Sequence, residues 1–443
     1  MTAEIAEDRS GRSPLLQETQ IGKIPDEWKL VRLGAITTES AFGPRFPATH
    51  YDPAGNFGTL RTTDITADWK INYKTIPRAK LDDQFRNHVL REGDLLVTRS
   101  GTCGVVCVFN KQEIDVIPGA FLIRFRLNDR ADPHFVRLAM MAGGSQARIQ
   151  SMAAGGVQKN LSGTNLAQLL LPLPPLGEQK KMAAILSSVD EAIEATQAVI
   201  DQLQIVKKAM MAELLTRGLP GRHTRFKQTE IGEVPEEWVV VPLEEVIKAG
   251  PDNGLYKPQT EYGAGTPIVR IDTFENGDFL SSQELRRVRV SPDELVRFGL
   301  TANDILINRV NSLSHLAKAA MVCSLTETTI FESNMMRFVV NESRASPSFV
   351  FRIVSSPRAK EFFLARAKQA VAQASVNQDD VRSLPVIIPR DDEQKAIAKL
   401  FDSIDERIRA ERDDLRGLVV AKDSLMSVLL SGEVRVKVDE DAA

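Results

Sequence analysis

Residues 17–36 read QETQIGKIPDEWKLVRLGAI, and residues 227–246 read KQTEIGEVPEEWVVVPLEEV. Ile, Gly, Pro, Trp and Leu recur at the same spacing in both segments. Three further segments return in the same order, with an offset that drifts only from 210 to 215 residues: 90–101 as 300–311, 131–138 as 345–352, and 158–181 as 373–396. A repeat of about half the chain indicates duplication, so the sequence predicts two copies of one fold.

Each copy has the pattern of a mixed α/β domain that is followed by a long helix. Short apolar stretches such as DLLVTR, GVVCVF and FLIRFRL alternate with Gly and Asn turns, which predicts much antiparallel sheet. A proline-rich hinge, LPLPPLGEQ in the first copy and LPVIIPRDDEQ in the second, then ends the strands. Because proline cannot donate to a ladder and disfavours a helical residue before it, a helix should begin just after each hinge. The predicted class is α+β.

Both predicted helices carry an apolar stripe at alternating spacings of four and three residues, which is typical of a coiled-coil seam. Both stripes contain polar residues at the same two positions, Thr196 and Lys207 in the first helix and Glu411 and Lys422 in the second. Because a whole domain intervenes, we expect the helices to pair antiparallel. A single buried face in a helical bundle is the alternative. The predicted seam consists of Leu186, Val189, Ile193, Ile200, Leu203, Phe401, Ile404, Ile408, Leu415 and Leu418.

These features predict a pseudo-twofold domain organisation. Its parts are a flexible N-terminus (1–16), a first mixed domain (17–175), a central helix (176–218), a second mixed domain with a basic leading linker (219–390), a C-terminal helix (391–435) and a flexible tail (436–443).

The composition is that of a globular protein, with 43% hydrophobic and 26% charged residues and a net charge of −3. No window approaches the roughly 18 apolar residues of a membrane span. The first residues, MTAEIAEDRS, carry acids where a signal peptide would be basic, so we expect a cytoplasmic location. The three cysteines show no metal-ligand spacing, and we expect no metal site and buried, reduced thiols.

Arginines at equivalent strand ends are candidates for nucleic-acid contact, because arginine suits guanine edges and phosphates. The alternative for Arg61 and Arg270 is an ion pair with Asp64, Asp272 or another carboxylate. The polar loops at 153–165 and 369–380 suit adenine edges and phosphates, or form capped turns. The predicted contact residues are Arg61, Arg99, Ser100, Gln158, Lys159, Asn160, Ser162, Arg270, Arg309, Asn311, Gln373, Ser375, Asn377 and Gln378.

The linker between the first helix and the second domain holds a basic run. Such a run can grip phosphates, although a solvated linker is the commoner explanation. Its residues are Arg217, Arg222, His223, Arg225 and Lys227.

The order of domain, helix, domain, helix resembles the specificity (S) subunit of type I restriction-modification enzymes. The resemblance rests on IGKIPDEW and IGEVPEEW, on GDLLVTRSGTCG, on both hinge-helix junctions and on the helix end KKAMMAELLTRG, and covers about residues 17–435. The second copy departs from the pattern, because Asn311, Ser312 and Ser314 replace Gly101, Thr102 and Gly104.

This resemblance implies a subunit that catalyses nothing. Each mixed domain would be a target-recognition domain that reads one half of a bipartite, asymmetric site in double-stranded DNA, and the helices would set the gap. Two methyltransferase (M) subunits would dock on it, and two restriction (R) subunits could join them. S-adenosylmethionine, ATP and Mg would be bound by those partners, which methylate adenine and restrict DNA.

Enzyme hypotheses find little support in the residues. There is no Asn/Asp-Pro-Pro-aromatic loop of a DNA methyltransferase and no Walker loop. Glu178-Gln179-Lys180 and Glu393-Gln394-Lys395 match a nuclease triplet, but they open helices, where acids suit the dipole. The remaining histidines occupy unrelated places in the two copies. A coiled-coil scaffold whose globular domains bind protein is the non-enzymatic alternative.

Overall fold

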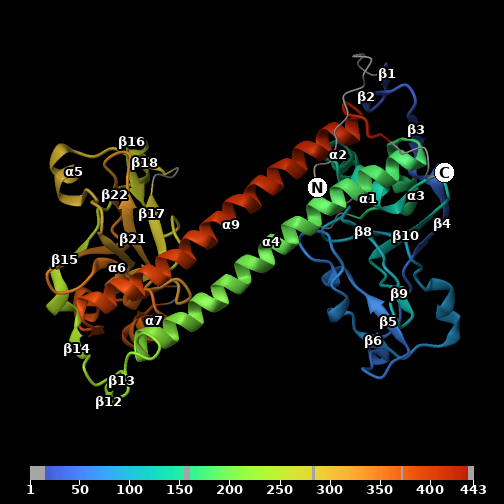
Figure 1. Ribbon diagram of the computed structural model, residues 1–443. Coiled ribbons are helices and arrows are strands. Elements are labelled where there is room, and N and C mark those ends of the chain that lie inside the picture. The colour runs from blue at the N-terminus through green and yellow to red at the C-terminus, as the bar shows by residue number, and fades with distance from the viewer. Residues whose placement is uncertain (1–14, 154–159, 282–284, 371–372, 438–443) are drawn as a thin grey trace. The chain divides into compact units, whose positions relative to one another are not determined.

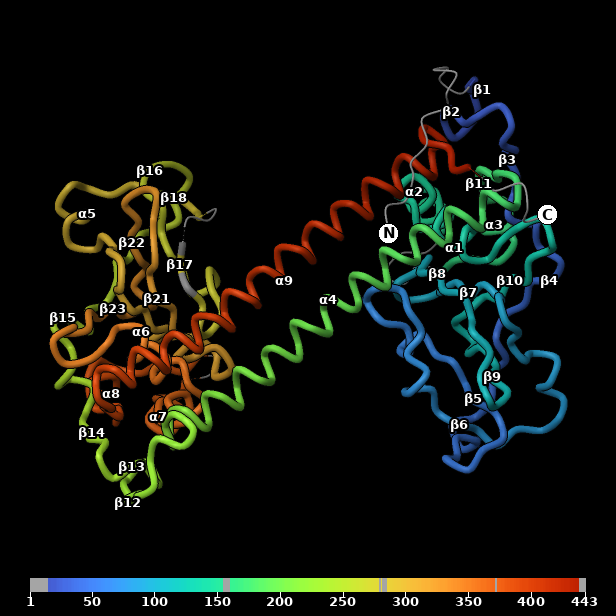
Figure 2. Tube along the Cα trace, viewed as in Figure 1, coloured from blue at the N-terminus to red at the C-terminus, as the bar shows by residue number. Residues whose placement is uncertain are grey.

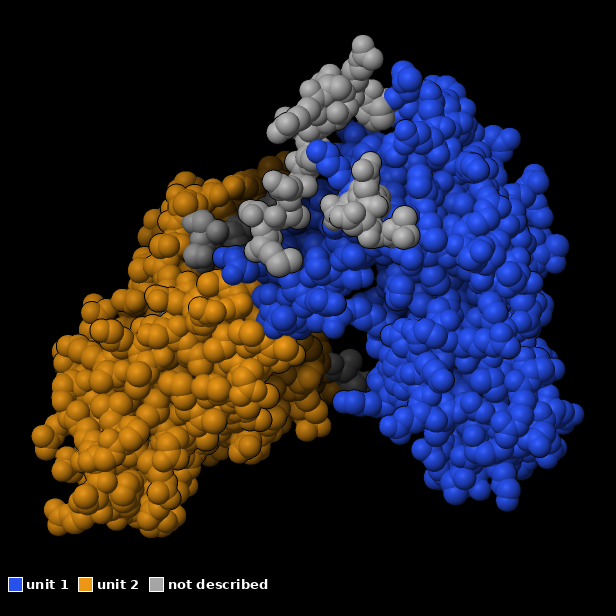
Figure 3. Space-filling model, turned by 45° about the vertical axis from the view of Figure 1, so that its right-hand side comes forward, with its two compact units in different colours: residues 1–197, 413–443 blue, residues 198–412 orange. Residues whose placement is uncertain are grey.

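The computed structural model describes residues 15–153, 160–281, 285–370 and 373–437 (Figure 1). The chain divides into two compact units, one of residues 1–197 with 413–443 and the other of residues 198–412 (Figure 3). Each unit combines one mixed domain with a half of each long helix. The flexible ends that we expected at 1–16 and 436–443 fall largely outside the described residues.

Unit 1 is built on an antiparallel four-stranded sheet in the order β4-β10-β7-β8, with α1 packed against it. Its strands are β1 (Leu16–Thr19), β2 (Gly22–Pro25), β3 (Lys29–Arg32), β4 (Thr37–Phe42), β5 (Phe57–Leu60), β6 (Arg78–Ala79), β7 (Leu95–Thr98), β8 (Val106–Val108), β9 (Val116–Pro118), β10 (Leu122–Leu127) and β11 (Leu170–Leu173). Its short helices are α1 (Pro133–Met141), α2 (Gly143–Met152) and α3 (Gly163–Ala167).

Unit 2 is built on a five-stranded sheet in the order β15-β23-β19-β21-β17. Its strands are β12 (Phe226–Thr229), β13 (Gly232–Pro235), β14 (Val239–Pro242), β15 (Ile247–Asn253), β16 (Tyr262–Val269), β17 (Asp278–Ser281), β18 (Arg287–Val288), β19 (Ile305–Asn308), β20 (Val310–Asn311), β21 (Ala319–Ser324), β22 (Ile330–Phe331), β23 (Met335–Val340), β24 (Lys368–Gln369), β25 (Ala374–Ser375) and β26 (Pro385–Ile388). Its short helices are α5 (Pro292–Phe298), α6 (Pro347–Val354), α7 (Pro357–Arg366) and α8 (Gln378–Arg382).

Every sheet of unit 1 has a counterpart in unit 2, which confirms the predicted duplication, and unit 2 adds the small sheet β20-β25-β24. The strand order β4-β10-β7-β8 is matched by β15-β23-β19-β21, and the pair β3-β11 is matched by β14-β26. The small sheets β6-β5-β9 and β18-β16-β22 agree even in their parallel pairings, β5 with β9 and β16 with β22. Unit 2 adds β17 at the edge of its main sheet. The α+β class that we predicted is therefore correct.

The long helices α4 (Leu176–Arg217) and α9 (Asp391–Ser431) pair within each unit (Figure 2). In unit 2, Lys207 Nζ lies 2.6 Å from Asp405 Oδ1, and in unit 1, Lys422 Nζ lies 2.6 Å from Asp190 Oδ1. The two contacts are the same pair of repeat positions with the helices exchanged. Such exchange marks a pseudo-twofold interface, and the order of the contacts along the helices shows that they run antiparallel. The lysines that interrupt the seam therefore bind across it.

Every predicted seam residue is at least half-buried, and Thr196 and Glu411 are satisfied on their own helices. Thr196 Oγ1 donates to the Ala192 carbonyl at 2.9 Å, and Glu411 forms an ion pair with Arg407. The buried seam residues are Leu186, Ile200, Phe401, Ile404 and Ile408, and the half-buried ones are Val189, Ile193, Leu203, Leu415 and Leu418.

A buried carboxylate at the start of α4 joins three distant parts of unit 1. Glu178 is 2% exposed, and its Oε2 accepts the indole N–H of Trp28 at 3.1 Å. Arg435, which follows α9, donates to both Glu178 oxygens, from Nε at 2.7 Å and from Nη2 at 2.9 Å. Glu178 therefore connects Trp28, near the first strands of the domain, to the segment that follows α9.

Unit 2 repeats this cluster with a histidine in place of the arginine. Glu393, at the start of α9 and 1% exposed, accepts the indole N–H of Trp238 at 3.1 Å. His223, which follows α4, places Nε2 2.9 Å from Glu393 Oε1. The histidine side chain is 5% exposed, and Arg222 forms an ion pair with Asp392 at 2.6 Å. The prediction of a solvated linker is therefore wrong for His223, because this side chain is buried against Glu393 at the start of α9.

The glutamines that follow the two glutamates hold the start of equivalent helices, α1 in unit 1 and α6 in unit 2. Gln179 Oε1 accepts the Asp132 backbone N–H at 2.8 Å, and Gln394 Oε1 accepts the Ser346 backbone N–H at 2.8 Å. Both side-chain amides also donate to a carbonyl of the preceding proline hinge. The Glu-Gln pairs that resembled nuclease triplets are therefore structural anchors.

The cysteines differ from one another in burial. Cys103 and Cys107 are buried, and burial raises the pKa of the Cys107 thiol to about 12. Cys323, on β21, is exposed, so the expectation of three buried thiols is wrong for this residue. No helix among the described residues is long and apolar enough to cross a bilayer.

Glu178→Gln should destabilise unit 1 by about 2 kcal/mol, because it leaves the Arg435 guanidinium with only the exposed Glu27 carboxylate and the Trp28 N–H with a weaker acceptor. Urea unfolding followed by tryptophan fluorescence measures this loss. The control is Glu191→Gln, at an exposed position of the same helix, which should shift stability by less than about 0.5 kcal/mol. Equal stability of the two variants would show that the cluster does not hold the unit together.

Candidate nucleic-acid interface

In unit 1, two predicted contact segments meet beyond the end of the central strand β7. The Leu161 backbone N–H donates to the Arg99 carbonyl at 2.9 Å, and Ser100 and Asn160 form an antiparallel bridge. The strand end and the polar loop, although far apart in sequence, are thus backbone neighbours. We call this place the strand-end edge of unit 1.

Unit 2 has the equivalent strand-end edge. The Val376 backbone N–H donates to the Arg309 carbonyl at 2.9 Å. Strand β20 pairs antiparallel with β25, so that Asn311 lies opposite Ala374 and Val310 lies opposite Ser375. Both units therefore bring the same two chain segments together, as the duplication requires.

Arg99 lies at the strand-end edge among exposed aromatic rings. Its guanidinium carbon is 4.3 Å from the centroid of the Phe42 ring, and its backbone N–H donates to the Phe121 carbonyl at 2.9 Å. Phe42 is 43% exposed and Phe121 is 53% exposed. Within the described part of the chain, Arg99 forms no ion pair. Stacking on a ring leaves the guanidinium donors available to a ligand.

Arg309 has a different environment in unit 2. Its Nη1 donates to the Ser333 carbonyl at 3.3 Å, and its buried Nε has no hydrogen-bond partner among the described residues. The preceding Asn308 is fully buried, and its Oδ1 is likewise unpartnered in the described structure. The two arginines thus share a backbone position but present their charge differently.

Arg61 and Arg270 are held by carboxylates, which was the alternative we considered for them. Arg61 donates to Asp64 from Nε at 3.1 Å and from Nη2 at 2.8 Å, and this hydrogen bonding raises the pKa of the guanidinium. Arg270 Nε lies 3.7 Å from carboxylate oxygens of Asp272 and Glu332. Hydrogen bonds therefore hold the Arg61 guanidinium in the fold, whereas Arg270 Nε has ion-pair neighbours but no hydrogen-bond partner among the described residues.

The other predicted contact residues divide by burial and local role. Ser162 Oγ accepts the Asn165 N–H at 3.0 Å and caps α3, and Asn377 Oδ1 accepts the Asp380 N–H at 2.9 Å and caps α8. Their side-chain oxygens thus serve as helix caps. Asn160 and Gln373 are exposed, while Ser100, Asn311, Ser375 and Gln378 are half-buried, and Gln158 and Lys159 lie outside the described residues.

The aspartates that recur before β7 and β19 are structural. Asp94 is 1% exposed and accepts two hydrogen bonds from Arg126, each at 2.9 Å. Asp304 is 3.8 Å from Arg337, and burial raises the pKa of its carboxyl. Each accepts the backbone N–H three residues earlier, which closes a turn. Among the residues that the structure describes, no group of three His, Cys, Asp or Glu is arranged to hold a metal ion.

Comparison with known proteins agrees with this duplicated architecture. A family model described as "Type I restriction modification DNA specificity domain" matches twice, at residues 25–204 and 235–416. The type I restriction enzyme MjaVIII specificity subunit of Methanocaldococcus jannaschii is 26% identical and covers 94% of this chain and 95% of its own length. The EcoKI specificity subunit of Escherichia coli is 26% identical and covers 58% of this chain and 55% of its own length.

A solved structure shares the fold. The S subunit of the type I restriction-modification system from M. genitalium aligns with a TM-score of 0.58 at 14% identity. The alignment covers 94% of this chain and 99% of that chain. The order of sheets and paired helices described above is thus an architecture already seen in a crystal.

Arg61→Ala should destabilise unit 1 by about 2 kcal/mol, because Asp64 is 1% exposed and would lose its charged partner. Arg99→Ala, also at a strand end, should change stability by less than about 1 kcal/mol, because it loses the stacking on the exposed Phe42 ring but breaks no ion pair in the described structure. Thermal unfolding of the two variants makes the comparison. If Arg99→Ala proved the more destabilising, the assignment of Arg61 to the fold and Arg99 to the surface would be wrong.

Proposed function

The chain belongs to the type I restriction-modification DNA specificity family, and from this premise we propose that each unit reads one half of a bipartite, asymmetric DNA site. The observation that supports the proposal is the strand-end edge, which recurs in both units on one backbone frame with different side chains. Arg99 and Ser100 lie there in unit 1, and Arg309 and Asn311 lie there in unit 2. A shared frame with different side chains is what two readers of different sequences require.

The domain boundaries follow from this assignment. Residues 17–175 and 219–390 are the two target-recognition domains, and the segments 176–218 and 391–435, which contain α4 and α9, form the spacer that sets the gap between half-sites. Arg99 and Arg309 are the leading candidates for base or phosphate contact. Arg61 and Arg270 act mainly by shaping the domain, because carboxylates already engage them.

In this proposal the chain itself catalyses no reaction. Two methyltransferase subunits dock on the pseudo-twofold helix pair, since an interface built of equivalent halves offers two equivalent surfaces. These partners bind S-adenosylmethionine and flip the target adenine out of the stack. Restriction subunits, where present, supply the use of ATP and Mg, and the assembly works in the cytoplasm. A protein-binding scaffold is disfavoured, because it does not explain why two domains with one backbone frame have different side chains at their strand-end edges.

Methylation mapping tests the proposal. Genomic DNA is compared between cells that hold the chain with its methyltransferase partner and cells that hold the partner alone. We expect a modified adenine in a two-part motif only when the chain is present. If both proteins are produced and associated but no two-part motif appears, the assignment as a DNA reader fails.

Arg99→Ala and Arg309→Ala should each relax one half-site and leave the other intact. Without the hydrogen bonds from arginine to a base edge, discrimination at one base pair falls by about 1–3 kcal/mol, which produces degeneracy at one motif position. The same mapping experiment reads this directly, and each variant serves as the matched control for the other. Relaxation of both half-sites by one variant would contradict the division of labour between the units.

A further inference from the structure

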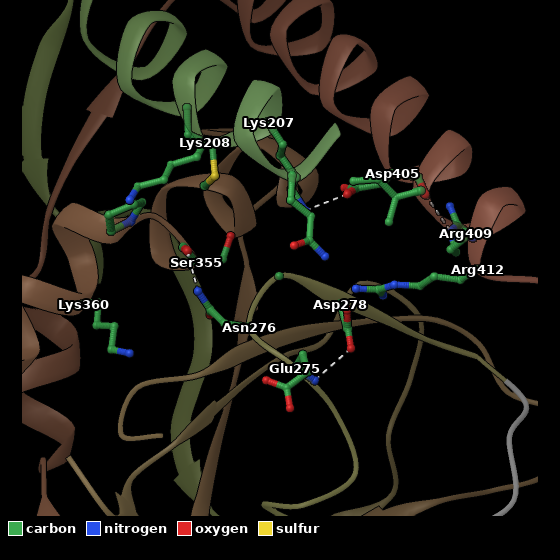
Figure 4. A pocket seen from close by; sticks show the side chains of 15 residues that line it. Lys207, Lys208, Glu275, Asn276, Asp278, Ser355, Lys360, Asp405, Arg409 and Arg412 are labelled. Carbon is green, nitrogen blue, oxygen red and sulfur yellow. Dashed lines mark hydrogen bonds and ion pairs between the residues drawn. The ribbon is translucent and has the colours of Figure 1, made fainter. Parts of the chain in front are cut away.

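A cavity of about 500 Å³ lies in unit 2 between the two long helices and the loop that leads into β17 (Figure 4). Residues of α4, α9 and α7 line it, together with residues 275–278 of the loop. All of its lining residues belong to unit 2. The residues of the strand-end edge of unit 2 do not line this cavity.

Three of the five lysines and arginines that line this cavity stand on three different helices and outside the Lys207–Asp405 ion pair. They are Lys208 of α4, Lys360 of α7 and Arg412 of α9. Within the described structure none of the three forms an ion pair with a carboxylate; Lys360 Nζ donates to the Ser314 carbonyl at 2.8 Å. Arg409, one turn before Arg412, also lines the cavity. These side chains bring positive charge into one confined space.

Two of the three carboxylates of the lining, against its five lysines and arginines, already form ion pairs. Asp405 forms an ion pair with Lys207 at 2.6 Å, and Glu275 forms one with Lys318 at 2.6 Å. Asp278 accepts the backbone N–H of Glu275 at 2.8 Å, which closes the loop (Figure 4). The cations of the cavity therefore exceed the carboxylates available to neutralise them, and the excess favours an anionic ligand.

Unit 1 reverses this charge at the equivalent positions. The counterparts of Lys208, Arg409 and Arg412 are Asp423, Glu194 and Gln197, and the counterpart of Lys360 is Gln146. Glu194 is already ion-paired with Lys70 of its own unit. Because unit 1 folds in the same way without these cations, the fold does not require them. Their presence in unit 2 alone points to a ligand of that unit.

We propose that the cavity is a phosphate subsite that holds the DNA backbone beside the half-site read by unit 2. This inference rests on the proposed function, and it adds a contact outside the base-reading edge. Arginine and lysine side chains are the usual partners of backbone phosphates. No described residue of the lining is aromatic, so a nucleotide base would find no ring to stack on, whereas a backbone phosphate needs none.

The test uses the complex of the chain with its methyltransferase partner. DNA affinity is measured by fluorescence anisotropy at several salt concentrations for Lys208→Gln, Lys360→Gln, Arg412→Gln and the triple variant. We expect weaker binding of specific and non-specific DNA alike, with a salt slope that falls in magnitude by roughly 0.9 for each phosphate that is no longer neutralised. The methylated motif should not change. Lys399→Gln, at an exposed site of α9 that does not line the cavity, is the control and should bind as the unmodified chain does.

A second arm locates the phosphate. Single methylphosphonate substitutions are placed beside the half-site that Arg309→Ala relaxes. At the contacted position the neutral linkage should weaken binding by the unmodified complex but not by the triple variant. Thermal unfolding of each variant shows that the fold is intact.

Three results would overturn the inference. If the triple variant keeps the affinity and salt slope of the control while specific binding persists, the subsite is wrong and the proposed function stands. If ATP, used as the free-nucleotide probe, binds in a way that depends on the three cations while DNA binding does not, the ligand is a nucleotide. If the unmodified complex shows no sequence-specific DNA binding, the proposed function fails and the subsite fails with it.

Discussion

The fold depends on a buried carboxylate at the start of each long helix. Glu178 and Glu393 are almost fully buried, and each accepts the indole N–H of a tryptophan that begins the domain. Each also contacts a basic side chain from the segment after the opposite helix, Arg435 in unit 1 and His223 in unit 2. A buried charge is tolerated only when such partners satisfy it, so the cluster forms as a whole or not at all. Unit 1 is thereby closed by residues from both ends of the chain.

The helix pair likewise contains partly buried charges that are paired with a partner on the other helix. The seam lysines bind the opposite helix, Lys207 to Asp405 and Lys422 to Asp190. Polar residues at seam positions cost stability but restrict the register, because a slip would bury each lysine without its aspartate. Since the two contacts are equivalent under the duplication, one register satisfies both. The frame is thus duplicated, while the side chains at the strand-end edges and the cations of the unit 2 cavity are not.

Much of this frame could be predicted from the sequence, because it follows from the local periodicity of apolar residues and from the internal repeat. The heptads, the proline hinges and the alternating apolar stretches predict the helices, their antiparallel pairing and the sheets. The roles of Glu178 and Arg435 could not be predicted, because 257 residues separate them and an acid at a helix start usually faces water. Likewise, the sequence allowed Arg61 either to contact DNA or to pair with a carboxylate, and the structure pairs it with Asp64. The exposure of Phe42 and Phe121 could not be predicted either, since large apolar residues beside strands are normally buried.

The central claim is that two readers are spaced by one helix pair, and lengthening that pair tests it most directly. One heptad inserted at equivalent seam positions in both helices adds about 10 Å at 1.5 Å per residue, or about three base pairs of DNA. If the helix pair sets the gap, the methylated motif keeps both half-sites and its spacer lengthens by about that amount. An unchanged spacer in a stable, DNA-binding variant would contradict the claim.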